Sequence, residues 1–600
     1  MKILLTAINA KYIHSNLAVY SLYAYAKRLC QHLAVAEYTI NHSLDFVMQE
    51  IFRQRPDVLC FSCYIWNITF VEELSRELHK LLPGMPIWVG GPEVSYECDA
   101  FLQRNPQITG ILRGEGEQSF YGLCCHYAEG SVELSGIPGL VYRQEGLSAA
   151  EEPAGMAEEP AGMAENLQAA AELVHTPDAE PLPMDSLPFC YEDLAGLKNR
   201  IVYYETSRGC PFRCSYCLSS LEKSLRLRSM SLVERELQFF LDHRVPQVKL
   251  VDRTFNCSHA HAMAIWQYLA DHDNGVTNFH FEISADLLNE EELRLLGQMR
   301  PGLVQLEIGV QSTNLDTLAE IRRTTDLCRL EENAARIRSF GNIHQHLDLI
   351  AGLPMEGYDS FRASFDQVYG MHPQQLQLGF LKVLKGSWLY ENRERYGILF
   401  RHRPPYEVLA TQWLSYEELL RIKLVEEMLE VYGNSGQYEV TLKLLEQEFE
   451  SPFDIFLKVG YYYQEKGLLW KQHSRLGRCE ILLRFLEQEC SWADLSLYQE
   501  ALTFDLYYRE NMKSRPPWAP DPALWRAQAR SVQRKGENAH LEPFSYDFFG
   551  FLQGQSARPK KQEGWQLYRF SYEERDPLTR QARVEPVMGQ FTEGRGETSC

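Results

Sequence analysis

Long apolar runs are absent from this chain, which is evidence against a membrane-spanning protein. No stretch of its 600 residues approaches the ~18 consecutive apolar residues of a transmembrane helix. The apolar start, Ile3 to Ile8, is interrupted at Asn9 and Lys11, so it is too short for a secretory signal and suits a buried first strand. We therefore expect a cytoplasmic protein. In those reducing surroundings, metal binding or catalysis explains its 15 cysteines better than disulfides do.

Basic residues are missing from one window of the chain. Between Arg143 and Lys198 there is no Lys or Arg, whereas 12 Asp and Glu occur there. Without those 12 the formal charge of −21 becomes about −9, so the acidity belongs mainly to one segment, and nucleic acid is disfavoured as a partner. Inside this window Ala150–Met156 is repeated without change as Ala157–Met163. Because the window offers so little apolar surface to bury, residues 141–185 are predicted to form an acidic flexible linker.

Residues 1–140 alternate short apolar runs with amphipathic helical patterns. This alternation predicts an α/β domain, a Rossmann-like doubly wound parallel sheet with helices on both faces. The expected strands are Lys2–Ala7, Val35–Ile40, Val58–Tyr64, Ile87–Val89 and Ile108–Leu112.

The alternation resumes in residues 186–395, where six βα units in about 190 residues predict a (β/α)6 partial TIM barrel. Its active site is expected at the carboxyl ends of the strands. Ser231, with Glu234 three residues on, predicts a capping box at the start of one helix. Residues 396–600 are predicted to form a mainly helical domain. The expected barrel strands are Val202–Thr206, Gln247–Val251, Asn278–Ile283, Val304–Val310, His344–Ile350 and Gln377–Val383.

One short segment concentrates the candidate metal ligands Cys210, Cys214 and Cys217. They follow the first predicted strand of the barrel at spacings of four and three. A structural zinc site would need a fourth Cys or His at ligand spacing, and none follows Cys217 within several residues. An iron–sulfur cube needs four ligands, so three thiolates leave one iron with an open position. That iron can chelate the amino and carboxylate groups of S-adenosylmethionine (SAM) and pass an electron to its sulfonium.

The cysteine segment resembles the CxxxCxxC signature of the radical SAM superfamily, with the aromatic Tyr216 before the last Cys. The resemblance implies that the three cysteines bind a [4Fe-4S] cluster. Gln305–Ser312 resembles the fourth-strand motif of that superfamily, which implies that Glu307 and Gln311 contact SAM.

A second stretch, Asp348–Pro354, resembles the fifth-strand motif, in which Gly352 lets the backbone approach the adenine of SAM. The Gly-Gly-Glu run that many members use for the SAM amino group is missing after the second strand. Asp252 is the candidate substitute there. The carboxylates of Glu282 and Glu307 suit either SAM binding or an ordinary ion pair at a strand end.

Two glycine-bearing turns follow strands of the first domain and hold Gly90 with Gly91 and Gly114 with Gly116. Upstream of a radical SAM core they resemble the cobalamin-binding domain of one large radical SAM class, which implies a cobalamin cofactor. The motif Asp-x-His-x-x-Gly is absent from residues 1–140, so we expect cobalamin to bind without a histidine on cobalt. The C-terminal region resembles a domain of unknown function found in one branch of that class.

Cys60 and Cys63 also form a C-x-x-C pair, but they lie within a predicted strand. Alternation in a strand puts residues three apart on opposite faces. The pair is therefore better explained as two buried free thiols than as a metal site.

The resemblance implies an enzyme that modifies, most often by methylation, an unreactive carbon of a small molecule. It also implies an electron donor such as flavodoxin or ferredoxin. Two alternatives remain open. A tRNA methylthiotransferase-like enzyme would need three further cluster cysteines early in the chain and a small RNA-binding β-barrel at the end, and neither is visible. A non-catalytic sensor of SAM or cobalamin would have no need of a reducible cluster.

The cysteine spacing generates the first testable prediction. Anaerobically purified protein should hold one four-iron cluster, and Cys214→Ala should lose it because a cube bound by only two thiolates is poorly held. Iron and sulfide content with visible absorbance measure this. Full cluster absorbance and SAM cleavage in the variant would contradict the assignment.

Overall fold

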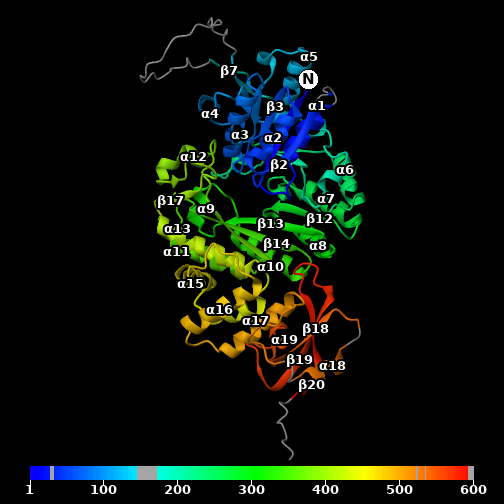
Figure 1. The fold of residues 1–600 in the computed structure, drawn as a ribbon, viewed down its shortest axis with the longest axis vertical. Coiled ribbons are helices and arrows are strands. Elements are labelled where there is room, and N and C mark those ends of the chain that lie inside the picture. Colours follow the sequence, from blue (N-terminus) through cyan, green and yellow to red (C-terminus); the bar gives the residue numbers. More distant parts are fainter. Residues whose placement is uncertain (28–30, 32, 145–171, 522–524, 534–535, 592–600) are drawn as a thin grey trace, which may run out of the picture. The chain divides into compact units, whose positions relative to one another are not determined.

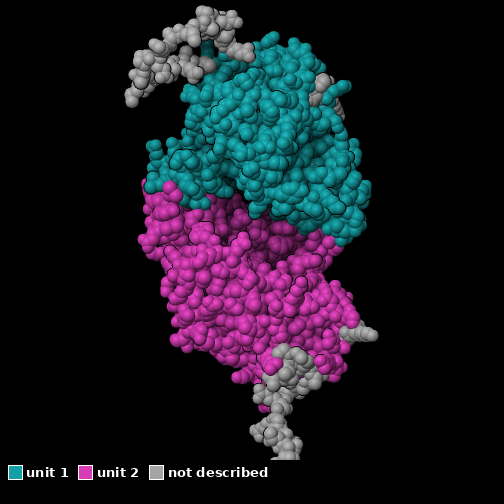
Figure 2. Space-filling model, viewed as in Figure 1, with its two compact units in different colours: residues 1–282, 382–408 teal, residues 283–381, 409–600 magenta. Residues whose placement is uncertain are grey.

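The computed structural model describes residues 1–27, 31, 33–144, 172–521, 525–533 and 536–591. The chain divides into two compact units (Figure 2). Unit 1 contains Met1–Glu282 and Lys382–Val408, and unit 2 contains Ile283–Leu381 and Leu409–Cys600. In the described residues, no helix is long and apolar enough to cross a membrane.

Unit 1 begins with a seven-stranded sheet in the order β2-β1-β3-β4-β5-β6-β7 (Figure 1). The first five strands pair in parallel, as predicted, and the pairs β5–β6 and β6–β7 are antiparallel. The strands are β1 (Ile3–Asn9), β2 (Leu33–Thr39), β3 (Val58–Ser62), β4 (Ile87–Gly90), β5 (Gly110–Leu112), β6 (Leu140–Arg143) and β7 (Leu173–His175).

Helices cover both faces of this sheet, which confirms the doubly wound arrangement. Alternate residues of β1 enter different cores, Leu4 on one face and Leu5 on the other. Cys63 belongs to the first of these cores and Cys60 to the second, so the prediction of two buried free thiols on opposite faces is confirmed. The helices are α1 (Leu17–Lys27) and α5 (Gly116–Glu129) on one face, and α2 (Leu44–Gln54), α3 (Ile68–Leu81) and α4 (Cys98–Arg104) on the other.

The ends of the predicted linker belong to the sheet instead. β6 and β7 take up residues inside the range 141–185 and pair with each other, with Tyr142 opposite Val174. These two short strands were missed because their apolar runs are only three residues or fewer and are flanked by acidic residues and prolines, which favour the prediction of a linker. The duplicated segment, 150–163, lies outside the described residues.

The first half of the barrel lies in unit 1. Strands β8 (Val202–Tyr204), β11 (Gln247–Leu250) and β12 (Asn278–Ile283) pair in parallel, and helices α6 (Met230–Asp242) and α7 (His259–Asp271) connect them. The capping-box prediction was wrong, because α6 begins after Ser229 and that residue makes no side-chain cap hydrogen bond. Ser231 instead lies inside the first turn.

The second half of the barrel lies in unit 2. Strands β13 (Val304–Gln311), β14 (His344–Ala351) and β15 (Gln375–Phe380) are parallel. All six predicted barrel strands are thus present, with β15 beginning two residues earlier than expected. The connecting helices are α8 (Glu290–Gln298), α9 (Leu315–Glu320), α10 (Leu327–Phe340) and α11 (Tyr358–Gly370).

The C-terminal region opens with helices, as predicted. A capping box between Ser415 and Glu418 starts the first of them. An antiparallel sheet of three strands follows and was not predicted. Its aromatic side chains pack on Phe504, whose ring centroid lies 5.1 Å from that of Phe570. The elements are α13 (Tyr416–Met428), α14 (Glu439–Leu445), α15 (Pro452–Glu465), α16 (Arg475–Glu489), α17 (Leu495–Arg509), β18 (Ala539–Tyr546), β19 (Lys561–Arg575) and β20 (Ala582–Phe591).

Gly91, after β4, tests this packing. Its φ is +117°, and a Cβ there would stand 2.5 Å from the carbonyl oxygen of Cys63. Gly91→Ala should therefore lower the free energy of unfolding by about 1–3 kcal/mol, whereas Gly84→Ala, with nothing within 4 Å of its Cβ, should change it little. Thermal unfolding of the two full-length variants compares them, and equal midpoints would contradict the close approach.

Candidate active site

The three cysteines sit on one loop bracketed by a two-stranded ribbon. The loop leaves β9 (Ser207–Arg208) and returns at β10 (Arg226–Leu227), and these strands pair antiparallel. Gly209 has φ +89°, and a Cβ there would collide with the carbonyl oxygen of Ser224. Only glycine therefore lets the ribbon close directly before Cys210.

None of the three cysteines forms a disulfide. Cys210 and Cys214 are buried, Cys217 is partly exposed, and the Cys217 N–H donates to the carbonyl of Cys214 at 3.1 Å. Burial raises the pKa of Cys210, and the charge of Cys217 adds to this rise, so these two sulfurs act on each other. Hydrogen bonds from Phe212 N–H and Thr254 and the charge of Arg253 oppose the rise.

This donor set fits a cluster better than a single ion. Among the described residues, no group of three or more His, Cys, Asp or Glu converges on a position for one metal ion. A four-iron cube does not ask for such convergence, because each thiolate binds a different iron. Three free thiols on one tight loop meet its requirement.

Asp252 lies at the base of the loop. Its carboxylate accepts hydrogen bonds from Thr206 N–H at 3.0 Å, Thr206 Oγ1 at 2.5 Å and Ser207 Oγ at 2.6 Å. The side chain is 1% exposed, and burial raises its pKa. Both oxygens accept hydrogen bonds from the segment that leads into the cysteine loop, so Asp252 holds the start of that loop. Its contact with the SAM amino group stays a prediction.

Arg253, the next residue, was missed by sequence reasoning. Its guanidinium lies 3.2 Å from Glu282, at the end of β12, and Lys249 lies 3.6 Å from the same carboxylate. Burial would lower the pKa of Arg253, but Glu282 and then Cys217 and Cys210 raise it. Arg253 thus pairs with Glu282 and interacts electrostatically with two of the cysteines. The sequence did hold one signal for Arg253, because the residue lies in the segment that stands where many superfamily members have Gly-Gly-Glu.

The other candidate SAM residues belong to two different units. Tyr216 is half-buried on the cysteine loop of unit 1. Glu307 and Gln311 of unit 2 lie on the face of β13 opposite its buried Leu306 and Ile308. Gln311 and Gly352 have φ of 73° and 88° at their strand ends. Their contact with SAM stays a prediction.

Local packing and turn geometry can be described for each of the glycines that are expected to admit cobalamin. A Cβ on Gly90 would lie 3.3 Å from the carbonyl oxygen of Leu112, and one on Gly116 would lie 3.0 Å from the side chain of Leu22 on α1. Gly114 has φ +70° in open space. Packing and turn geometry therefore account for Gly90, Gly91, Gly114 and Gly116 without a ligand.

The strand order points to different loops. In a sheet ordered β2-β1-β3-β4-β5, a ligand sits where the order reverses, at the carboxyl ends of β1 and β3. The loop after β3 stacks Tyr64 on Trp66, with ring centroids 4.4 Å apart, and Asn67 donates to the carbonyl of Ile8. His14, after β1, hydrogen-bonds the Tyr203 hydroxyl at 2.6 Å. Sequence reasoning missed these loops because strand order cannot be read along the chain.

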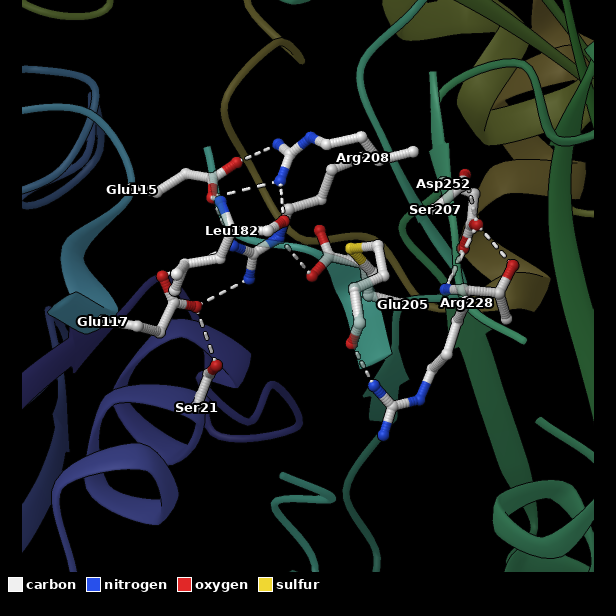
Figure 3. A network of polar contacts seen from close by, with 12 residues as sticks. Ser21, Glu115, Glu117, Leu182, Glu205, Ser207, Arg208, Arg228 and Asp252 are labelled. Carbon is white, nitrogen blue, oxygen red and sulfur yellow. Dashed lines mark hydrogen bonds and ion pairs between the residues drawn. The ribbon is translucent and has the colours of Figure 1, made fainter. Parts of the chain in front are cut away.

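Ion pairs fasten the cysteine loop to the turn after β5 (Figure 3). Arg208 lies 2.6 Å from Glu117, 3.2 Å from Glu115 and 2.9 Å from Glu205. Burial would raise the pKa of Glu117, but the charge of Arg208 and hydrogen bonds from it and from Ser21 lower it. Burial raises the pKa of Glu205 to about 7 against the opposing charge of Arg208.

Comparisons with known proteins agree with this geometry. Residues 204–368 match the family model of the radical SAM superfamily, and residues 3–123 match that of the B12 binding domain. The chain thus contains a radical SAM domain and a B12-binding domain. Residues 394–553 match a protein family of unknown function, DUF4080. The predicted resemblances and the fold class are thereby confirmed.

Two relatives of this chain carry methyltransferase names. It is 28% identical over 319 residues to 2-(S-pantetheinyl)-carbapenam-3-carboxylate methyltransferase of Streptantibioticus cattleyicolor, covering 51% of this chain and 44% of that protein. It is 26% identical to the cobalamin-dependent radical SAM methyltransferase TokK of Streptomyces tokunonensis, covering 57% and 50%. The chain thus spans about half the length of these curated relatives.

Two solved structures share its fold. The cobalamin-dependent SAM radical enzyme OxsB, with aqua-cobalamin and SAM bound, has a TM-score of 0.56 at 15% identity, covering 84% of this chain and 78% of that one. The radical SAM methyltransferase TsrM of Kitasatospora setae, with tryptophan and a SAM analogue, has a TM-score of 0.52 at 17% identity, covering 66% and 76%.

The raised pKa of Glu205 makes the stability of the folded chain depend on pH. A carboxyl whose folded pKa is raised binds its proton more tightly in the folded chain, so the folded state loses stability as the pH rises from the ordinary carboxyl range to about 7. Glu205→Gln removes this loss. The stability of the variant relative to wild type should therefore rise from pH 5 to pH 7.5 and then level off, measured by thermal unfolding. A difference that is constant or falls with pH would contradict the raised pKa.

Proposed function

We propose that this protein is a radical SAM enzyme that holds a [4Fe-4S] cluster, SAM and cobalamin and methylates an unreactive carbon of a small molecule. The observation that carries the proposal is found within unit 1. There, a loop with three cysteines that form no disulfide is joined by buried ion pairs to a B12-binding domain.

The chain's own residues have separable tasks. When bound, the cluster supplies the electron that cleaves SAM, and cobalamin supplies a carrier for the methyl group. Cys210, Cys214 and Cys217 hold three irons and leave the fourth open. Asp252 fixes the start of the loop, and Arg253 places a positive charge beside two thiolates while Glu282 orients it.

The SAM-binding residues are also proposed rather than observed. Tyr216, Glu307, Gln311 and Gly352 occupy the motif positions that contact SAM in the superfamily. The strand-end places of Gln311 and Gly352 suit a site at the carboxyl ends of barrel strands. An electron donor such as flavodoxin or ferredoxin is proposed as the partner, because the reaction consumes an electron.

Methylation is favoured because the first two relatives share the name methyltransferase. The tRNA methylthiotransferase alternative would need accessible early cysteines, yet Cys60 and Cys63 are buried on opposite faces of their sheet. Their burial raises the pKa of Cys60 to about 12 and that of Cys63 further. Neither thiol is available as a second cluster ligand.

The test of this proposal traces a labelled methyl group from SAM to cobalamin. Protein reconstituted anaerobically with iron, sulfide and hydroxocobalamin, then given SAM with a deuterated methyl group and a reductant, should transfer deuterium to cobalamin and release 5′-deoxyadenosine. Mass spectrometry measures both products.

A matched control separates this chemistry from thiol loss in general. Cys328→Ala, at an exposed free cysteine of α10, should leave both products unchanged, whereas Cys214→Ala should abolish 5′-deoxyadenosine. Cleavage of SAM without labelled cobalamin would overturn the methyl-transfer assignment and leave radical SAM chemistry alone.

A further inference from the structure

Two arginines stand directly opposite each other on the ribbon that brackets the cysteine loop. Arg208 of β9 pairs with Arg226 of β10 in the antiparallel register. Like charges directly opposite on neighbouring strands repel. The ribbon therefore needs anions beside it, and the sequence places Arg208 only two residues before Cys210.

Glu115 supplies the shared anion. One of its carboxylate oxygens lies 3.2 Å from Arg208, and the other pairs with Arg226. Glu115 precedes α5 in the B12-binding domain, so a residue of that domain joins both arms of the ribbon. Arg226 is held further by Glu222 at 2.5 Å.

The contact continues into the B12-binding domain. Glu117, in the first turn of α5, accepts a hydrogen bond from Ser21 of α1 at 2.9 Å and pairs with Arg208 at 2.6 Å. α1 follows the loop after β1, which is one of the two loops at the point where the strand order reverses. A series of contacts thus runs from α1 through Ser21, Glu117 and Arg208 to the ribbon beside the cysteine loop (Figure 3).

These groups are shielded from water. The side chains of Arg208, Glu115 and Glu117 are 14%, 21% and 5% exposed. Ion pairs in such places are strong only with all partners present, because removing one leaves a buried charge without compensation. The ribbon and the turn after β5 therefore form or loosen together.

We propose that Glu115, with Arg208 and Arg226, couples the two cofactor sites, so that a cluster on the cysteine loop strengthens cobalamin binding and cobalamin stabilises the cluster. The inference rests on the two proposed cofactors and not on methyl transfer. Coupling between two binding sites is reciprocal, and Glu115 acts as a positioning residue for the cysteines.

The chain offers a matched control in Arg200 and Glu37. They lie 2.9 Å apart, with side chains 14% and 11% exposed, and join the segment before β8 to strand β2. This pair resembles the Arg208 contacts in burial and also fastens the barrel half to the sheet. Its arginine, however, lies outside the cysteine ribbon.

The test measures hydroxocobalamin affinity by equilibrium dialysis, on full-length protein with its cluster and on the same protein freed of iron by a chelator. In wild type the cluster should tighten cobalamin binding about 5–150-fold, the usual range for coupled sites. Glu115→Gln should bring this ratio close to one, Glu115→Asp should restore part of it, and Arg200→Gln should keep it.

A second measurement follows the reciprocal effect. Hydroxocobalamin should slow the loss of cluster iron to a chelator in wild type and in Arg200→Gln, but not in Glu115→Gln. A wild-type ratio of one, or a wild-type ratio retained by Glu115→Gln, would overturn the coupling. If neither wild type nor any variant bound cobalamin, the proposed cobalamin cofactor itself would be wrong. This outcome is distinct from cobalamin binding without coupling, which contradicts the coupling alone.

Discussion

The electrostatic interaction between Cys210 and Cys217 on one short loop is the constraint on which the contacts around that loop in unit 1 depend. Burial adds to it by removing water from Cys210 and Cys214. The structure offsets both costs with nearby donors and cations, Arg253 and Thr254 beside Cys210 and the arginines of the ribbon just outside the loop. Those cations in turn require carboxylates, and the B12-binding domain provides two of them. The cluster loop and the neighbouring sheet are therefore linked by charge balance.

The fold was largely predictable because its signals are local and periodic. Each of the six barrel strands has an apolar core of its own, such as Val304, Leu306 and Ile308 of β13, and each was placed within a few residues. The strands that were missed, β6, β7 and the three-stranded sheet at the end of the chain, are short or rich in aromatic and charged residues. Their identity depends on pairing with segments that are distant in sequence.

The site was predictable only where covalent spacing fixes the chemistry. Three cysteines at spacings of four and three indicate an iron–sulfur cluster from the sequence alone, without knowledge of the residues that pack around them. The roles of Asp252 and Arg253 depend instead on which residues the fold places beside them. Thr206 and Ser207 donate hydrogen bonds to Asp252. Glu282 forms an ion pair with Arg253 and orients it. The motif position of Asp252 gave no sign that its buried carboxylate would accept hydrogen bonds from these nearest donors.

The burial of the remaining thiols bears on how iron is sorted during cluster assembly. A thiolate binds iron and a thiol does not. Burial raises the pKa of Cys60, Cys190 and Cys479 to about 12 each, so these groups stay protonated at neutral pH. An iron ion arriving at the folded chain therefore meets neutral, poorly binding sulfur at these three positions. Their burial reduces the number of places at which the folded chain could hold misplaced iron.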